Sequence, residues 1–180
     1  MASLYYIIGA SGAGKDSLMN YARAAINGSH PVIFANRYIT RPLGTGNENH
    51  ISLSPEEFKC RLEGGLFALD WGSHRQLYAI GKEIDEYRNK GFTVAVNGSR
   101  EYLATAREKY SELKVVMIEA SPELIRRRLL DRGRESPADI EGRIARNLAL
   151  SRPAGPLIRI GNDGSLAEAG EKLVSVLIGS

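Results

Sequence analysis

The segment that most constrains the fold of this chain lies near its amino end, where a strand pattern, a glycine-rich turn and a helix pattern follow one another. Residues 4–8 form a continuous apolar run, which predicts a buried strand. Residues 18–26 repeat apolar side chains at helical spacing. Between them, residues 9–16 match the P-loop pattern G-x-x-x-x-G-K-[ST] except at the last position, where Asp16 stands. Strand, loop, lysine and helix in this order are the context that a phosphate-binding loop requires.

The loop residues predict a site for the phosphates of a nucleotide. Glycine lets the backbone wrap closely, so that successive N–H groups point inward at an anion, and the next helix adds the positive end of its dipole. Lys15 follows as a cation that can reach the β- and γ-phosphates. We therefore predict ATP as a cofactor, bound through Gly9, Ala10, Ser11, Gly12, Ala13, Gly14, Lys15, Asp16 and Ser17.

Magnesium is the second expected cofactor. The P-loop pattern places a Ser or Thr hydroxyl on Mg²⁺, but Asp16 occupies that position and Ser17 comes one residue later. A carboxylate is a good ligand for this hard cation. The sequence leaves open whether Mg²⁺ contacts Asp16, Ser17 or neither.

The rest of the chain alternates apolar runs with helix signals. Further strands are predicted at residues 32–35, 93–96, 115–118 and 157–160. Ser-Pro pairs, which supply an N-cap and a first-turn proline, predict helix starts at residues 54–55, 121–122 and 136–137. Glu57 is expected to close a capping box with Ser54, and a helix that begins near Lys82 is expected to end at Gly91. The alternation predicts an α/β fold of the P-loop NTPase class, with a mostly parallel sheet flanked by helices, as one domain over residues 1–180.

Charge and composition limit the partners. The 180 residues carry a net charge of +3, and residues 123–159 hold nine Arg against five acids, which suits a small anionic substrate. That segment contains no Phe, Trp or Tyr. Single-stranded nucleic-acid sites combine basic residues with aromatic platforms, so no nucleic-acid partner is expected. Since no run approaches the roughly 18 apolar residues of a membrane helix and no leader pattern is visible, we expect a cytoplasmic protein without a membrane partner.

Two single residues have simple structural interpretations. The one cysteine, Cys60, excludes an internal disulfide, and its helix pattern predicts a packed apolar side chain. Trp71 is expected to pack in the core.

The sequence leaves a homodimer open.

From the P-loop onward the chain resembles the guanylate kinase group of nucleoside-monophosphate-kinase-like folds over nearly its whole length. The likeness is carried by residues 40–42, 54–58, 65–67, 128–135, 140–146 and 162–164. Within that group the chain is most similar to the ribose 1,5-bisphosphate phosphokinase family, in which an Asp after the P-loop lysine is typical. This second likeness is carried by residues 12–18, 37–42, 48–50, 67–71 and 96–100, together with His74.

The resemblance implies a guanylate-kinase-like fold with an acceptor-binding region at about residues 36–82 and an Arg-rich lid at about residues 130–146. It implies phosphoryl transfer from ATP to a phosphorylated sugar, ribose 1,5-bisphosphate, giving 5-phospho-α-D-ribose 1-diphosphate in phosphonate breakdown. The residues implied as catalytic are Lys15, Arg132, Arg143 and Arg146. Those implied at the acceptor are Arg37, Arg41, His50, Tyr78 and Asn97, and those implied at ATP beyond the loop are Arg134 and Asn162.

A guanylate kinase, or another nucleoside-monophosphate kinase of the same fold, is the first alternative. Leu69 stands where that group uses a carboxylate to accept N–H groups of guanine. A leucine leaves those groups unpaired, a loss on the order of several kcal/mol. Asp70 would replace the carboxylate only if the register shifts by one residue. The sequence also departs from the bisphosphate kinase pattern, at Arg75, Ala79 and Gly81.

A catalytically inactive binding module of the same fold is the second alternative. Such modules typically lose the P-loop lysine, whereas Lys15 is present with its glycines. Some candidate residues also have plainer interpretations. Arg143 and Arg146 would then form salt bridges with Asp139 or Glu141, and His50 would lie on a loop surface.

Overall fold

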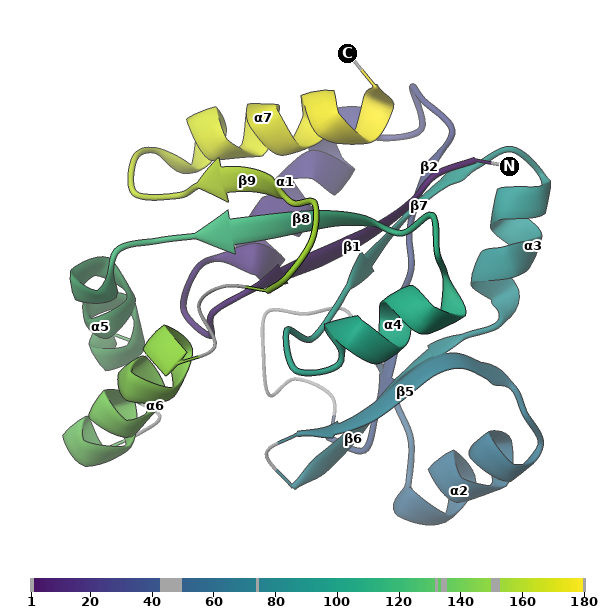
Figure 1. Ribbon diagram of the computed structural model, residues 1–180, viewed down its shortest axis with the longest axis horizontal. Helices are drawn as coiled ribbons and strands as arrows, with labels where there is room; N and C mark the ends of the chain where they lie inside the picture. Colours follow the sequence, from purple (N-terminus) through teal and green to yellow (C-terminus); the bar gives the residue numbers. More distant parts are fainter. Residues whose placement is uncertain are drawn as a thin grey trace.

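A five-stranded parallel sheet forms the centre of the computed structural model, which describes residues 2–42, 50–73, 75–131, 133, 136–149 and 153–179 (Figure 1). The strand order is β2–β7–β1–β8–β9, so the first strand of the chain lies in the middle. The strands are β1 (Leu4–Gly9), β2 (Val32–Phe34), β7 (Thr93–Asn97), β8 (Lys114–Glu119) and β9 (Ile158–Gly161). The predicted apolar runs are therefore all strands, and every pairing between neighbours is parallel.

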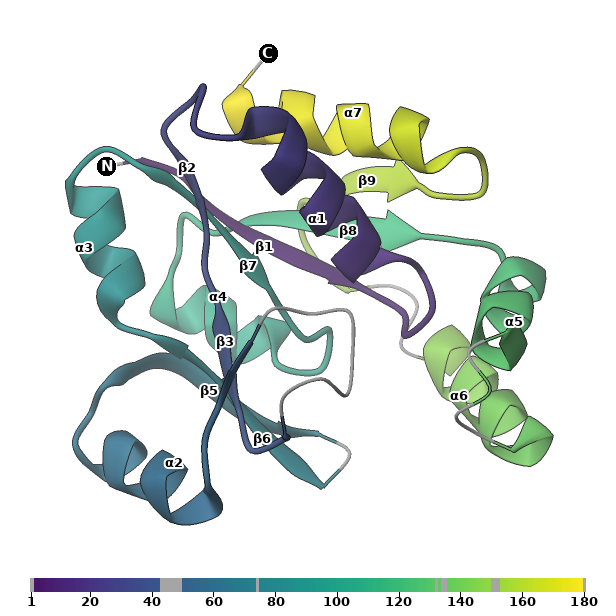
Figure 2. The same ribbon diagram turned by 180° about the vertical axis from the view of Figure 1, so that it is seen from behind.

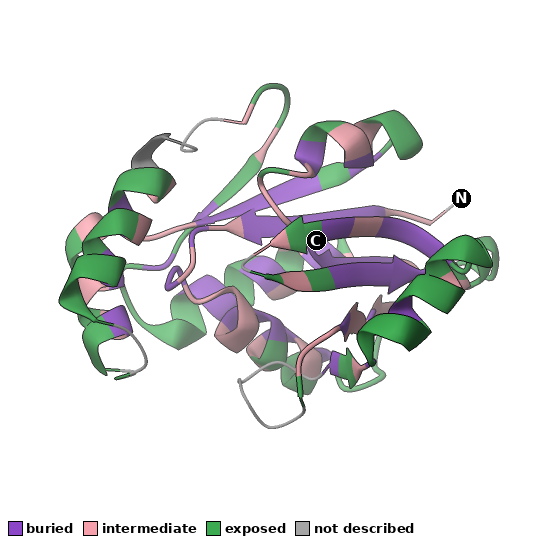
Figure 3. Ribbon diagram, turned by 90° about the horizontal axis from the view of Figure 1, so that it is seen from below, coloured by how far each residue is buried: buried purple, intermediate pink, exposed green. Residues whose placement is uncertain are grey.

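Helices cover both faces of this sheet, as Figures 1 and 2 show from opposite sides. On one face lie α1 (Lys15–Ile26) and α7 (Leu166–Ile178), and on the other lie α3 (Glu83–Asn89) and α4 (Leu103–Lys109). Along β1, Tyr5 and Ile7 pack into the core beneath α1 and α7, while Tyr6 and Ile8 pack into the core of the opposite face. Because both faces are buried, the strand reads as a continuous apolar run rather than an alternating one. Seen from below, the strands are mostly buried and the outer helices carry the exposed residues (Figure 3).

A second sheet with one helix lies below the large sheet in Figure 1. Its order is β4–β3–β6–β5, with β3 and β4 parallel and the other neighbours antiparallel. Its elements are β3 (Arg37–Ile39), β4 (His50–Ser52), α2 (Pro55–Glu63), β5 (Phe67–Ser73) and β6 (Gln76–Gly81). Of these, the sequence predicted only α2. Two of the strands have three residues each, and β5 and β6 are interrupted by Gly and polar residues, so neither gives a clear strand period.

α5 (Pro122–Asp131) and α6 (Pro137–Ala149) form a pair of helices at one end of the molecule (Figure 1). Ile125 and Leu129 from α5 pack in the same core cluster as Ile140 and Ile144 from α6. The predicted lid, residues 130–146, falls mainly on α6. Arg132 and Arg134 of this predicted lid lie outside the described residues. His74, in the predicted acceptor-binding region, also lies outside them.

The helix ends follow the predicted signals, with one difference at α2. Ser54 caps this helix, because its Oγ accepts a hydrogen bond from Glu57 N at 3.1 Å. The Glu57 carboxylate, expected to complete the capping box, accepts a hydrogen bond from Arg61 Nη2 at 2.6 Å. A complete capping box stands instead at the start of α7, between Ser165 and Glu168.

Cys60 differs from its prediction, because its side chain is exposed rather than packed. The helix that carries it, α2, buries Phe58 against the small sheet and turns Cys60 to the outside. Among the described residues, none of the helices has the length and apolar character needed to cross a membrane.

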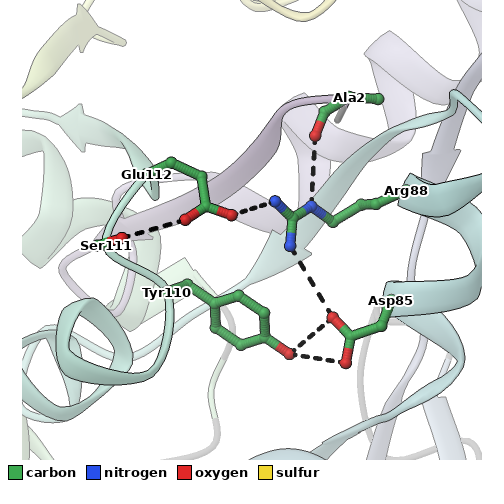
Figure 4. A network of polar contacts seen from close by, with 6 residues as sticks. All are labelled: Ala2, Asp85, Arg88, Tyr110, Ser111 and Glu112. Atoms are coloured by element: carbon green, nitrogen blue, oxygen red, sulfur yellow. Dashed lines mark hydrogen bonds and ion pairs between the residues drawn. The ribbon is translucent and has the colours of Figure 1, made fainter.

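A buried arginine ties the amino end of the chain to α3 and to the turn before β8 (Figure 4). The Arg88 side chain is 4% exposed and donates to the Ala2 carbonyl at 3.3 Å and to the Glu112 carboxylate. Its Nη1 lies 3.9 Å from Asp85 Oδ1, and Tyr110 donates to the same carboxylate at 3.0 Å. Burial, followed by the hydrogen bond to Asp85, raises the pKa of Tyr110. The network holds together segments that are distant in the sequence.

Candidate active site

The glycines of the P-loop occupy positions that a side chain would disturb. Gly12 and Gly14 have φ values of +88° and +96°, which glycine adopts without strain. A Cβ atom at Gly14 would lie 2.3 Å from Asn162 Nδ2, and one at Gly9 would lie 2.5 Å from the Ile118 carbonyl oxygen. The loop therefore packs closely against the ends of β8 and β9.

Two polar side chains support the loop from behind. Asn162 is 2% exposed, and its Nδ2 donates to the Ala13 carbonyl at 2.7 Å. Arg128 of α5 donates to the same carbonyl at 3.3 Å and to the Asn162 carbonyl at 3.0 Å. Asn162 thus lies beneath the loop, and its implied contact with adenine stays a prediction. Arg128 was not singled out from its neighbours in the sequence, because three consecutive arginines do not reveal which one points inward.

Lys15 begins α1, directly after the loop. Its Nζ donates to the Gly9 carbonyl at 2.9 Å and is 3.4 Å from the Ala10 carbonyl. The ammonium group therefore lies over the loop, at the place where phosphates are expected.

Asp16 is joined to the end of a neighbouring strand. Asn97, the last residue of β7, donates from Nδ2 to Asp16 Oδ1 at 2.8 Å. Asn97 is 4% exposed, and its Oδ1 is buried without a hydrogen-bond partner in the part of the chain that the structure describes. Among those residues, no three His, Cys, Asp or Glu side chains gather so that they could hold a metal ion. Asp16 offers one carboxylate, and Mg²⁺ is usually held by one or two carboxylates and the substrate phosphates rather than by a protein cage.

A cavity of about 530 Å³ opens in front of the loop. Among the described residues, its walls carry six basic side chains against two carboxylates, which favours the binding of anions. The basic residues are Lys15, Arg37, Arg41, Arg100, Arg143 and Arg146, and the acidic ones are Asp16 and Glu101. Of the predicted site residues, Tyr78, Asn97 and most of the P-loop line the same cavity, whereas Ala13, Ser17, His50 and Asn162 are not among its lining residues.

The wall opposite the P-loop comes from the small sheet. The Arg37 guanidinium lies over the Tyr78 ring at 5.1 Å, and Trp71 stacks on Tyr78 with a centroid distance of 5.7 Å. Trp71 is buried, as expected, but it also lines the cavity. His50 is buried rather than on a loop surface, and its Nε2 lies 3.1 Å from the Arg41 carbonyl. It therefore positions the backbone of Arg41.

The wall on the side of α6 is formed by arginines. Arg143 Nη1 donates to Ser11 Oγ of the P-loop at 2.9 Å. The two acids named as alternative partners are engaged elsewhere, because Glu141 accepts from Arg126 at 2.7 Å and Asp139 accepts from a serine hydroxyl at 2.6 Å. The structure thus turns Arg143 toward the loop.

Arg100, which follows β7, belongs to the stretch 96–100 that carries the family likeness, but it was not singled out as a site residue because a turn position does not reveal its partner. It donates to Asn147 Oδ1 of α6 at 2.5 Å and to the Asn147 carbonyl at 3.2 Å. Burial lowers the pKa of the Arg100 guanidinium, and the charge of Glu101 acts in the opposite direction. Arg100 thereby links the end of the large sheet to α6.

The residues expected to distinguish guanine lie away from the cavity. Leu69 is fully buried in the core between the two sheets. Asp70 points to the other side of β5, where its Oδ1 lies 3.7 Å from Lys109 Nζ. Neither residue lines the cavity, so neither the position of the guanylate kinase carboxylate nor the next one presents a carboxylate to a base bound there.

A parallel sheet that ends in a P-loop, a basic cavity, a small mixed sheet and a helical pair together define a P-loop kinase of the guanylate-kinase fold. A guanylate kinase from Anaplasma phagocytophilum superposes on 98% of this chain and 84% of its own with a TM-score of 0.71, at 14% identity, which supports the fold. At the level of sequence, the ribose 1,5-bisphosphate phosphokinase PhnN of Thiobacillus denitrificans is 49% identical over 174 residues, covering 97% of this chain and 92% of the relative. The enzyme of the same name from Desulfomicrobium baculatum is 47% identical over 178 residues, covering 99% and 95%.

The chain belongs to the ribose 1,5-bisphosphate phosphokinase PhnN family. No protein-family model matches it.

Proposed function

We propose that this protein transfers the γ-phosphoryl group of ATP to the 1-phosphate of ribose 1,5-bisphosphate, giving 5-phospho-α-D-ribose 1-diphosphate and ADP. The observation that carries the proposal is the distribution of basic residues on facing walls of one cavity. Lys15, Arg143 and Arg146 lie on the side of the P-loop and α6, while Arg37 and Arg41 lie on the side of the small sheet. Such a cavity suits a donor and an acceptor that both carry phosphate groups.

In this reaction an oxygen of the acceptor phosphate forms a bond to the γ-phosphorus, and the bond from that phosphorus to the β–γ bridging oxygen breaks as ADP leaves. The attacking oxygen is already anionic, so the protein supplies alignment and charge neutralisation rather than a base. Lys15 binds the β- and γ-phosphates, and Arg143 and Arg146 stabilise the charge of the group in transfer. Arg37 and Arg41 hold the acceptor phosphates through their planar guanidinium groups.

When bound with the nucleotide, Mg²⁺ would supply positive charge beside its phosphates. Asp16 is the residue that suits it best, because its carboxylate lines the cavity at the head of α1, whereas Ser17 does not line it. The implied roles of Arg132 and Arg134 at the lid belong to the same proposal, as do a cytoplasmic location and a place in phosphonate breakdown. The sequence left a homodimer open, and the proposal does not depend on one.

The test is an acceptor panel with ATP and Mg²⁺, in which ADP release is followed with ribose 1,5-bisphosphate, ribose 5-phosphate and GMP as acceptors. We expect turnover with ribose 1,5-bisphosphate and at least about a hundredfold lower kcat/KM with GMP, since neither Leu69 nor Asp70 lines the cavity to pair with the N–H groups of guanine. A preference for GMP would contradict the proposed acceptor and leave the nucleotide site intact. The guanylate kinase alternative would then be correct.

A further inference from the structure

The departure of the P-loop from its pattern is matched by a second departure on β7, one of the two strands that pair with β1. The other strand, β8, ends in Glu119, but this carboxylate pairs with Arg159 and does not line the cavity. In P-loop NTPases, Mg²⁺ is held by the Ser or Thr of the loop and by a carboxylate, the Walker-B Asp. Here the loop position carries Asp16, and β7, which pairs with β1, ends in Asn97 beside Ile7. Since Asn97 Nδ2 donates to Asp16 Oδ1 at 2.8 Å, the carboxylate and the strand end are in direct contact.

The environment of Asn97 indicates a role beyond packing. The residue is 4% exposed, and Oδ1 has no hydrogen-bond partner within the described parts of the chain. A buried amide oxygen in that state is unfavourable and calls for an explanation such as an ion or a water bound at the site. Asn97 also lines the cavity, next to the P-loop.

Among the described residues that line the cavity, the second carboxylate, Glu101, suits a metal ion less well than Asp16. Glu101 is exposed and stands four residues beyond the end of β7. Asp16 is half-buried, and the bond from Asn97 fixes one of its oxygens. The other oxygen, Oδ2, is the one that can take a cation.

We propose that this chain has exchanged the two metal-holding positions of the P-loop. The loop supplies the carboxylate, Asp16. The strand end supplies Asn97 as a positioning residue, whose Nδ2 holds Asp16 by donating to Asp16 Oδ1. The pair keeps the single negative charge of a Ser–Asp arrangement, and it avoids two carboxylates at hydrogen-bonding distance, which would repel each other. The inference rests on the proposed function only in assuming that a metal–nucleotide complex enters the cavity.

The test measures the affinity for Mn²⁺, a paramagnetic substitute for Mg²⁺, by titration in the presence of saturating ADP with detection of free ion by electron paramagnetic resonance. We expect Asn97→Ala to weaken Mn²⁺ binding by about 10–100-fold, as loss of a partner of a metal ligand does, and Asp16→Ser to weaken it at least as much. The decisive variant is the exchange Asp16→Ser with Asn97→Asp, which should recover about tenfold or more over Asp16→Ser alone. A matched control is Asn20→Asp, an exposed change of the same chemistry on α1, which should leave the affinity unchanged.

The outcomes separate the inference from the proposed function. If the wild-type protein binds Mn²⁺ with ADP but the exchange variant binds no better than Asp16→Ser, the exchange of positions is wrong. An affinity of Asn97→Ala equal to that of the wild type would contradict the positioning role as well. If a thermal melt shows that Asn97→Ala does not fold, the exchange variant, whose change at Asn97 is isosteric, decides alone. Absence of nucleotide-dependent Mn²⁺ binding in the wild type would instead contradict the proposed function.

Discussion

Gly14 and Lys15 contribute to the phosphate-binding loop in different ways. Gly14 has φ +96° and packs against Asn162, so that a Cβ atom would collide with the amide nitrogen at 2.3 Å. Lys15 makes its described contacts with the loop carbonyls of Gly9 and Ala10. Its replacement therefore removes charge from the cavity without opening a gap in the core. The glycine maintains the shape of the loop, and the lysine supplies its charge.

Replacement of Lys15 by Ala is expected to lower kcat at least about a hundredfold, because the variant loses a cation aimed at the phosphoryl group in transfer. The melting temperature should change little. ADP release and a thermal melt measure the two effects. Lys59→Ala is the matched control, since Lys59 is 74% exposed in a surface ion pair with Glu63, and it should keep full activity. Unchanged turnover in Lys15→Ala would show that the loop does not drive the reaction.

At the residue scale the sequence predicted where the P-loop lies, but it did not predict the side chains that support the loop from behind. A motif with fixed spacing identifies Lys15 and the unusual Asp16 from the order of the residues alone. Asn162 and Arg128 support the loop through contacts across 149 and 115 positions of the chain. A pairing over that separation leaves no local pattern. The same holds for Arg100, whose partner Asn147 stands on another helix.

The helices and strands differ in how clearly the sequence predicts them. The strands of the large sheet are buried on both faces, so their apolar runs are continuous and all were predicted. The small sheet has one three-residue strand that begins with Arg37 and another that begins with His50. Such strands are held by pairing with β6 and by each other, and not by their own composition. Tertiary pairing therefore decides this part of the fold.

Arg88 connects structural elements through polar contacts that no sequence motif indicates. Its replacement tests how much these contacts stabilise the fold. Arg88→Met keeps much of the apolar stem but removes the donors to Ala2, Asp85 and Glu112. We expect the free energy of unfolding to fall by roughly 1.5–3 kcal/mol, the range for hydrogen bonds to charged groups, as measured by urea denaturation. Arg127→Met, an exposed change on α5, should shift it by less than about 0.5 kcal/mol. Equal effects of the two substitutions would contradict a stabilising role for the network.

On the scale of the whole molecule, the two sheets and the helical pair enclose one basic cavity. The large sheet supplies the P-loop at the end of its central strand, and α6 supplies Arg143 and Arg146. β3 of the small sheet supplies Arg37, and the segment that follows β3 supplies Arg41. A net charge of only +3 for the chain conceals this concentration, because acids elsewhere balance it. The distribution of charge, rather than its total, identifies the site.

The central claim is that the loop after β1 binds the polyphosphate of a nucleotide. Isothermal titration calorimetry of the intact protein with ADP and with a non-hydrolysable ATP analogue, each with Mg²⁺, tests it most directly. We expect binding to one site with a Kd on the order of 1 μM to 1 mM, the span in which enzymes commonly hold their substrates. No detectable heat of binding and no saturation at millimolar nucleotide would contradict the account.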